Sequence, residues 1–371
     1  MTSDPLSRAG AILEIDLAGI AANWRLLAQK VEPARCAAVV KADAYGLGAS
    51  QVSAALAAAG CRLFFVATIE EGISLRPALA EPIEIAVLNG PLPGSAGEFI
   101  EHRLTPVLND PGQVADWRAV AAELSVPRAM LHIDTGMARL GLTMREFAKL
   151  AVELAEGPIT WHAFISHLAC SDEPGHTLNQ IQRARFASAR SRLAHLPASL
   201  AASSGIFLGP EFHFDFVRPG AALYGVNPQP GAPNPMRQII RLRGRILQIR
   251  DVDRGETVGY GAAHVTSGPS RLATVAVGYA DGWLRSFSHR GSGRLGVRRV
   301  PLIGRVSMDL AVFDVTEADP ALARPGGFVE LLGDDYGVDA AAADAGTIGY
   351  EILSSLGRRY HRIYRGSPCR C

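Results

Sequence analysis

Eight short apolar runs divide the first two-thirds of this 371-residue chain. Each run is nearly continuous in hydrophobic residues, as is typical of strands that are buried on both faces. The runs are 36–40, 64–68, 83–88, 105–108, 129–134, 161–167, 199–203 and 213–218. Eight strands alternating with helices over about 230 residues predict an α/β fold, a (β/α)₈ TIM-type barrel, with an open doubly wound sheet as the alternative.

Helices are predicted between these runs, for example over 49–60 and 177–196. The first of them ends in Gly60, a residue type suited to the position just after a helix.

The pattern changes after Gly225. Residues 227–235 form a Pro-rich connector that cannot continue a helix. Beyond it, Gly-containing turns separate β-type runs, and a helical pattern returns at 346–356. These runs are 245–250, 271–277, 295–303 and 328–332. We therefore predict an N-terminal extension over 1–10, the barrel over 11–240 and a mainly β domain over 241–371.

Composition excludes several classes of protein. Hydrophobic residues make up 48% of the chain, charged residues 20%, and the formal net charge is +1, so nothing favours a nucleic-acid or anionic-membrane partner. An odd count of five cysteines without a CxxC pair argues against a disulfide framework or a metal site. Cys369 and Cys371 lie in a polar tail for which we expect no function. No apolar run reaches membrane-spanning length, and the first residues lack a signal-peptide pattern, so a cytoplasmic protein is expected.

Lys41 directly follows the first apolar run, and Tyr45, Gly46 and Gly48 come soon after it. A lysine at a strand end is most often a surface residue. In a barrel, however, the loops after the strands build the active site. The glycines let the backbone approach a ligand, and a partly desolvated lysine is suited to forming an imine with a carbonyl cofactor.

The loops after the last two predicted strands are suited to binding phosphate. They read SSG at 203–205 and RPGA at 218–221, and they supply hydroxyls and backbone N–H groups. Serine and glycine are also ordinary turn residues. Arg139 and His167 follow two further strands; a single histidine there is most often structural, but several polar groups at one barrel face indicate a site.

Six motifs, in this order, resemble those of the alanine racemase family, and the likeness extends from about residue 11 to about residue 364. They are AVVKADAYGLGA (38–49), HIDTGMARLG (132–141), VRPGAALYG (217–225), VGYADGW (277–283), GRVSMD (304–309) and TIGYEIL (347–353). The resemblance implies a barrel and a β domain in a head-to-tail homodimer, in which the β domain contributes to the partner's active site. It also implies interconversion of L-alanine and D-alanine on a pyridoxal 5′-phosphate aldimine, either supplying peptidoglycan precursors or serving alanine catabolism.

The resemblance assigns roles residue by residue. Lys41 would carry the cofactor, and Lys41 and Tyr279 would be the two catalytic groups, with Tyr279 positioned by His167 of the other subunit. The remaining cofactor-binding residues would be Tyr45, Arg139, His167, Ser204, Arg218, Gly220, Ala221 and Tyr350. Arg139, Met308 and Asp309 would bind the substrate, Met308 through its backbone N–H.

These roles suit the chemistry. Racemisation removes a proton from one face of Cα and delivers one to the opposite face, so two groups serve better than one. Lys41 must be neutral and the phenol ionised; cations such as Arg139 and a protonated His167 would favour the ionised phenol. Because a guanidinium stays protonated, Arg218 would donate to the pyridine nitrogen, weaken the cofactor as an electron sink and limit side reactions.

The chain departs from the family pattern at several positions. Many members have a carbamylated lysine where this chain has His132, and its negative charge orients the arginine corresponding to Arg139. We expect a bound anion or another hydrogen-bond arrangement near Arg139 instead. Ser203 and Gly349 stand where asparagine is common, and Ser307 where cysteine is common.

Other functions remain open. A broader-specificity amino-acid racemase, acting for example on serine, usually carries a secretion signal. A non-catalytic pyridoxal-phosphate-binding protein would not need the second domain. Related barrel decarboxylases typically place an acidic residue where this chain has Arg218.

Overall fold

The computed structural model describes residues 5–123 and 128–366. The chain forms two compact units. Among the described residues, one unit comprises 20–237, and the other combines 5–19 with 238–366. Cys369 and Cys371, for which no function was expected, lie outside the described residues.

The first unit is built on a parallel sheet of seven strands that follow one another in chain order. They are β3 (Ala38–Val39), β4 (Leu63–Val66), β5 (Glu84–Val87), β6 (Thr105–Leu108), β7 (Arg128–His132), β8 (Thr160–Ile165) and β9 (Ala198–Ser199). An eighth strand, β10 (Phe216–Val217), pairs in parallel with β2 (Arg35–Cys36), which immediately precedes β3. A bridge between Ala202 and Arg218 joins the segments that follow β9 and β10. The sheet therefore curls into a ring, which confirms the barrel and excludes the open sheet.

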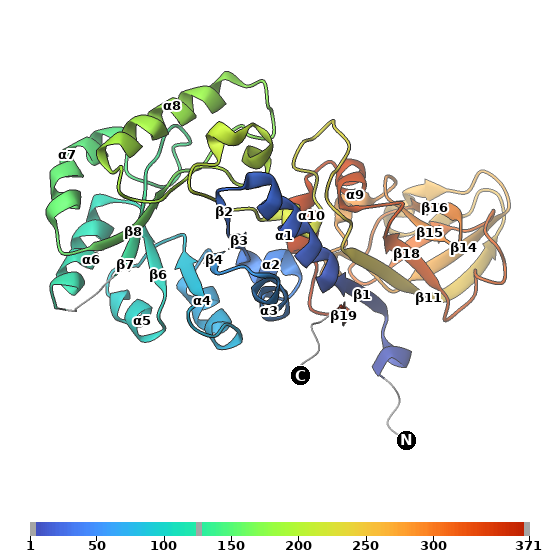
Figure 1. The fold of residues 1–371 in the computed structure, drawn as a ribbon. Coiled ribbons are helices and arrows are strands. Elements are labelled where there is room, and N and C mark those ends of the chain that lie inside the picture. The colour runs from blue at the N-terminus through green and yellow to red at the C-terminus, as the bar shows by residue number, and fades with distance from the viewer. Residues whose placement is uncertain (1–4, 124–127, 367–371) are drawn as a thin grey trace. The chain divides into compact units, whose positions relative to one another are not determined.

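Helices connect the strands of this unit and lie outside them (Figure 1). They include α3 (Ala49–Ala59), α4 (Ile69–Leu75), α5 (Ala96–Glu101), α6 (Pro111–Glu123), α7 (Met144–Glu156) and α8 (Thr177–Arg192). Gly60 ends α3 with a φ of +118°, a backbone conformation that favours glycine, as predicted. Aromatic packing fixes helices to strands; Phe186 of α8 lies 4.8 Å from Phe164 of β8 between ring centroids.

The second unit is mainly β, as predicted. Its sheet has the order β14-β17-β16-β15-β18-β11-β1-β19, and an additional β11–β14 pairing closes six of the strands into a ring. The strands are β1 (Ala11–Asp16), β11 (Ile240–Val252), β14 (Ser270–Val275), β15 (Ser292–Leu295), β16 (Arg298–Ile303), β17 (Ala311–Asp314), β18 (Phe328–Leu332) and β19 (His361–Arg365). Two short helices, α9 (Val338–Ala345) and α10 (Gly349–Ser355), follow β18.

The structure shifts three of the predicted boundaries. Residues 11–19 were predicted to begin the barrel, but β1 pairs with β11 and β19 and so belongs to the β unit. The run 295–303 is not one strand but part of a hairpin, because Gly296 adopts a φ of +61° between β15 and β16. The predicted helix over 346–356 is α10, and the Ala-rich α9 precedes it. Among the described residues, no helix is long and apolar enough to cross a membrane.

Candidate active site

Lys41 stands at the carboxyl end of β3, where the chain makes an unusual turn. The four residues that follow, 42–45, all have φ between 53° and 55° and ψ between 42° and 51°. Non-glycine residues avoid this left-handed region at a cost of roughly 1–2 kcal/mol each. Strain of this kind persists only where surrounding contacts hold it, and it is concentrated at functional sites. Position and conformation together mark the left-handed turn 42–45 as part of a site.

The turn brings Tyr45 against the loop that follows β10. A Cβ placed on Gly220 would lie 2.4 Å from the Tyr45 hydroxyl oxygen, so only glycine fits at position 220. The Ser203 hydroxyl accepts hydrogen bonds from the N–H groups of Gly220 (3.0 Å) and Ala222 (3.1 Å). Ser203, predicted as part of a phosphate loop but without a role of its own, thus ties the two predicted phosphate loops together.

The N–H groups of Ser204 and Ala221 are those best suited to an anion. Both residues are buried, and within the described residues neither backbone N–H has a hydrogen-bond acceptor. A buried N–H without a partner is unfavourable, and neighbouring N–H groups of this kind form an anion-binding concavity. The N–H of Gly220, in contrast, is already used by Ser203. Gly220 therefore provides space beside Tyr45, whereas Ser204 and Ala221 provide donors.

Arg218 follows β10 and is 4% exposed. Its two terminal nitrogens donate to the Ser199 carbonyl (2.8 Å), the Ser199 hydroxyl (2.5 Å) and the Ser166 carbonyl (2.5 Å). Burial lowers the pKa of Arg218 to about 9, which still leaves the guanidinium charged at neutral pH. No carboxylate pairs with it in the described chain, and its Nε–H has no acceptor there. Of the five guanidinium N–H donors three are used, so the structure holds a buried cation with two donors to spare, the Nε–H and one terminal N–H.

Arg139 is carried by a loop whose shape is fixed from within. The Asp134 carboxylate accepts hydrogen bonds from the N–H groups of Gly136, Met137 and Ala138 at 2.8–2.9 Å. These bonds lower the pKa of Asp134 against the opposing effect of its burial. Arg139 itself is exposed and makes no hydrogen bond or ion pair with the described residues. Its guanidinium is therefore available to a ligand.

His132 is the last residue of β7, and His167 follows β8. Both imidazoles are electrically neutral. Burial, followed by the positive charge of Arg218, lowers the pKa of each to about 3. The expectation of a protonated His167 was therefore wrong: the imidazole lies among cations that oppose its protonation. Nδ1 of His132 lies 2.8 Å from Oδ1 of Asn109, whose amide nitrogen donates to two backbone carbonyls. Oδ1 can only accept, so His132 carries its proton on Nδ1 and bonds to Asn109 rather than to Arg139.

Lys41 is also affected by its surroundings. Burial lowers the pKa of its ammonium, the charge of Arg139 lowers it further, and the charge of Glu71 opposes both. A lowered pKa increases the fraction of neutral amine, the form that attacks a carbonyl carbon. Arg139 also acts on His167, whose pKa is lowered first by burial and then by the charges of Arg218, Arg139 and Lys41. The barrel residues predicted as a site thus interact electrostatically.

In the β unit, the predicted residues meet around the segment 304–309. The N–H of Tyr279 donates to the Ser307 carbonyl (3.1 Å), and the N–H of Ala280 to the Met308 carbonyl (2.9 Å). Within the described residues the N–H of Met308 has no acceptor, in agreement with a donor role toward a ligand. Asp309, predicted to bind substrate, instead pairs with Arg359 at 2.7 Å.

Besides Tyr279 and Tyr350, this unit has a third exposed tyrosine that sequence analysis missed. Tyr260 is 72% exposed, against 43% for Tyr279. It stands in a turn between Gly259 and Gly261, with φ of 73° and 71°, and the Arg305 guanidinium lies next to Gly261. The signal was present in the sequence as a tyrosine flanked by glycines, VGYGA. Tyr260 and Tyr279 thus flank the segment 304–309 from two sides.

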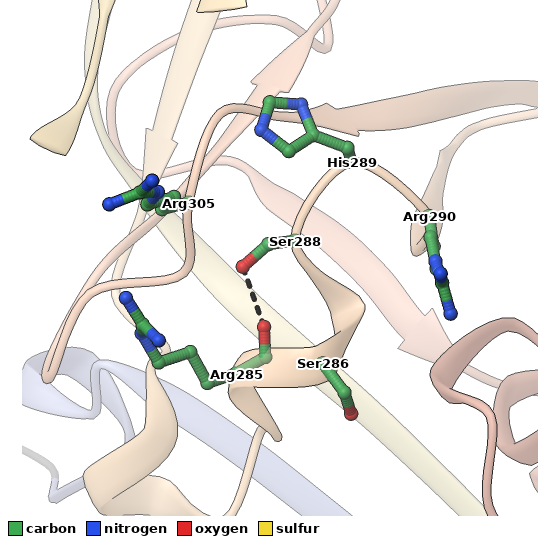
Figure 2. Close-up of a pocket in the computed structure, with 6 residues that line it drawn as sticks. All are labelled: Arg285, Ser286, Ser288, His289, Arg290 and Arg305. Atoms are coloured by element: carbon green, nitrogen blue, oxygen red, sulfur yellow. Dashed lines mark hydrogen bonds between the residues drawn. The ribbon is translucent and has the colours of Figure 1, made fainter. Parts of the chain in front are cut away.

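Arg305 also lines a positively charged surface pocket of about 470 Å³ in the β unit (Figure 2). In Figure 2 the other lining side chains surround Ser288, whose hydroxyl donates to the Arg285 carbonyl at 2.6 Å. The lining residues are Arg285, Ser286, Ser288, His289, Arg290 and Arg305. Three guanidinium groups without an acidic residue among them attract carboxylates.

Tyr350, predicted to bind phosphate, lies on α10 of the β unit and is 40% exposed. The described residues contain no cluster of histidine, cysteine and acidic side chains arranged for a metal ion.

Comparison with known proteins gives a consistent result. Residues 15–228 match the family "Alanine racemase, N-terminal domain", and residues 239–364 match "Alanine racemase, C-terminal domain". The chain is 52% identical to an alanine racemase of Rhodospirillum rubrum over 97% of each chain. It is 48% identical to a catabolic alanine racemase of Mesorhizobium japonicum over 99% of this chain and 97% of that one. It is also similar to the crystal structure of alanine racemase from Bartonella henselae with covalently bound pyridoxal phosphate, at 41% identity and a TM-score of 0.92, covering 96% of this chain and 99% of that one.

Proposed function

Because this chain belongs to the alanine racemase family, we propose that it interconverts L-alanine and D-alanine with pyridoxal 5′-phosphate bound at the barrel mouth. The observation that carries the proposal is the buried set of unpaired donors around Lys41. Such an activity supplies D-alanine for peptidoglycan or serves alanine catabolism. Of the similar proteins, that of Mesorhizobium japonicum is named catabolic and a solved structure from Pseudomonas aeruginosa is named biosynthetic.

The barrel residues fit the cofactor. The N–H groups of Ser204 and Ala221 and the hydroxyl of Tyr45 would hold its phosphate, whose charge would also compensate the buried guanidinium of Arg218. The Nε–H of Arg218 would donate to the pyridine nitrogen. The amine of Lys41 would bond covalently to the cofactor's aldehyde carbon. When bound, the cofactor withdraws electrons from Cα of the attached amino acid and makes its proton removable.

The chain's own groups would then move that proton. Neutral Lys41 would take or give it on one face of Cα, since burial and Arg139 favour its uncharged form. Arg139 would hold the substrate carboxylate, and in a head-to-tail homodimer the unpaired N–H of Met308 from the other subunit would assist it. The carboxylate of Asp309, already paired with Arg359, would not touch a carboxylate substrate. His167, being neutral, would act as a hydrogen-bonding group rather than as a cation.

A tyrosine of the β unit would serve the opposite face of Cα. Tyr279 is the residue that the resemblance indicates. Tyr260 is the alternative, and two observations support it: its greater exposure, and its position in a turn between two glycines beside the Arg305 guanidinium. In a head-to-tail homodimer this tyrosine would come from the partner subunit.

The matched variants Tyr260→Phe and Tyr279→Phe distinguish the two tyrosines. Exchange of the Cα proton of L-alanine and of D-alanine for deuterium is followed separately in each variant. The variant that loses the second acid/base loses exchange of one enantiomer by about 10²-fold or more and keeps exchange of the other. If neither variant separates the enantiomers, the two-group proposal fails.

The reaction itself is tested by chiral analysis. Each L-amino acid is incubated with enzyme and pyridoxal phosphate, and the D-enantiomer is measured. Conversion of alanine alone supports an alanine racemase. Comparable conversion of serine would support the broader-specificity racemase, and conversion of none would support a non-catalytic binding protein. Cofactor retained covalently by Lys41→Ala would contradict the role of Lys41.

A further inference from the structure

We propose that Glu71 is a positioning residue for Lys41: its carboxylate holds the strained turn that follows the lysine and places a negative charge beside the amine. The inference deepens the proposed function, because it rests on Lys41 as the cofactor-bearing group. It concerns the protein's own contacts, which can be measured without activity.

The left-handed turn 42–45 needs external contacts, since its non-glycine residues avoid this conformation. At its start, the N–H of Ala42 donates to Oε1 of Glu71 at 2.6 Å. From its second residue, Oδ1 of Asp43 accepts from the N–H of Ala49 at 2.8 Å, which joins the turn to the first residue of α3. Glu71 therefore anchors the end of the turn that directly adjoins Lys41.

A carboxylate is the only side chain of this length that satisfies all of the donors. Oε1 of Glu71 accepts from Ala42, while Oε2 accepts from the N–H of Ala67 (2.7 Å) and of Thr68 (3.4 Å). A glutamine would offer one oxygen and would place its NH₂ group against an N–H donor. The position thus requires two acceptor oxygens, which is a specific reason for glutamate.

Glu71 is itself held in place. The Thr68 hydroxyl accepts from the N–H of Glu71 at 3.4 Å, and the two residues form a capping box at the start of α4. The two main donors to the Glu71 carboxylate, the N–H groups of Ala42 and Ala67, are also fixed by the barrel. Ala42 follows β3, and Ala67 follows β4. The neighbouring strands β3 and β4 pair in parallel, so one carboxylate connects their carboxyl ends.

The charge of Glu71 has a second effect. Burial and Arg139 lower the pKa of Lys41, and Glu71 is the group that opposes them. Removal of the negative charge is therefore expected to lower the pKa of Lys41 further. A residue that only supported the fold would not change this pKa.

The test compares Glu71→Gln with Glu146→Gln. Glu146 is a matched control, because its Oε2 accepts from the N–H (2.9 Å) and the hydroxyl (2.8 Å) of Thr143 at the start of another helix, α7. Hydrogen–deuterium exchange of the full-length holoenzyme reports on the Ala42 amide. The chain has only three lysines, Lys30, Lys41 and Lys149, so ¹³C-methylated apoprotein gives the pKa of Lys41 from a simple NMR titration.

In Glu71→Gln, we expect the amide hydrogen of Ala42 to exchange about tenfold faster or more. The pKa of Lys41 should fall, and cofactor binding should weaken about tenfold. Glu146→Gln should change none of these. Glu71→Asp keeps the negative charge, but its shorter side chain does not reach the N–H of Ala42. It should therefore restore the pKa of Lys41 while hydrogen exchange at Ala42 stays fast. Glu71→Asp also takes the place of Glu71→Gln if that variant fails to fold.

Wild-type exchange at Ala42 together with a wild-type pKa of Lys41 in the Glu71 variants would overturn the inference. Failure of the proposed function gives a different result. In that case Lys41→Ala keeps a covalently bound cofactor, while the hydrogen bond from Ala42 to Glu71 is still detected by hydrogen–deuterium exchange.

Discussion

At the level of single residues, Arg218 shows how the barrel supports an unusual group. Its guanidinium is buried and held by three hydrogen bonds to Ser199 and Ser166, without a carboxylate among its described neighbours. A lysine ammonium is compact and cannot reach acceptors on both strands in the way the planar guanidinium does. The site therefore depends on this side chain for its stability as well as for its donor.

Arg218→Lys should lower the free energy of unfolding of the cofactor-free protein by about 2 kcal/mol or more, because a buried charge keeps too few hydrogen bonds. Urea denaturation measures the change. Arg192→Lys, at an exposed arginine of α8, is the control and should leave the stability nearly unchanged. Equal stabilities of the two variants would contradict this account.

The two neutral histidines determine how the protein responds to acid. The pKa of His132 and of His167 is about 3 in the folded chain, below the usual value near 6.5, so the unfolded chain binds more protons between these values. The stability from each histidine is complete above pH 6.5 and is lost as the pH falls. Between pH 6.5 and 5.5, each histidine should lower the free energy of unfolding by about 1 kcal/mol.

His132→Gln should reduce the number of protons taken up on unfolding by about one, since glutamine does not titrate. The slope of the free energy of unfolding against pH should decrease accordingly. Urea midpoints at several pH values between 7.5 and 5 test this. His195→Gln serves as a control at a histidine outside the candidate site. An unchanged slope in His132→Gln would mean that His132 is already protonated in the folded protein.

At the level of elements, the predictions succeeded where one pattern decides the structure. The run 328–332 is β18 residue for residue, and Gly60 ends α3 as expected. The strand β1 was not predicted, because its partners β11 and β19 lie more than two hundred residues away in sequence. The left-handed turn 42–45 could not be predicted either: its alanines and tyrosine avoid this conformation, and a carboxylate on α4 holds the turn.

The same limit applies to the candidate site. Lys41, Arg218 and the phosphate loops follow strands, so their convergence could be predicted from the barrel. Ser203 and Glu71 act through contacts with other loops, and the low pKa of His167 depends on its burial and on cations that follow three different strands. These features depend on distances that no sequence pattern encodes.

Gly220→Ala tests the packing of the turn against the phosphate loop. The added methyl group would overlap the Tyr45 hydroxyl, so cofactor affinity should fall about tenfold or more. Equilibrium binding of pyridoxal phosphate measures this. Gly97→Ala, with no atom within 4 Å of the added carbon, should bind normally. In a Tyr45→Phe background part of the loss should disappear; an equal loss would exclude the hydroxyl contact.

At the level of the whole molecule, the proposed homodimer predicts complementation. Subunits carrying Lys41→Ala are mixed with subunits carrying Tyr260→Phe or Tyr279→Phe, whichever abolishes activity. If each site combines the lysine of one subunit with the tyrosine of the other, a mixed dimer contains one intact site and regains up to about half of the activity per dimer. No recovery after demonstrated subunit exchange would contradict a shared site.

The position of β1 has a consequence for how the protein is made. Residues 11–16 are synthesised before every other strand of the β unit, yet β1 lies between β11 and β19, and 345 positions separate Asp16 from His361. At about 5–20 residues per second, roughly 20–70 s pass before β19 exists. The barrel segment, complete at residue 237, can fold in that interval. The six residues of β1, five of them buried in the finished protein, await their partners with apolar side chains exposed, which makes them a natural binding segment for chaperones during synthesis.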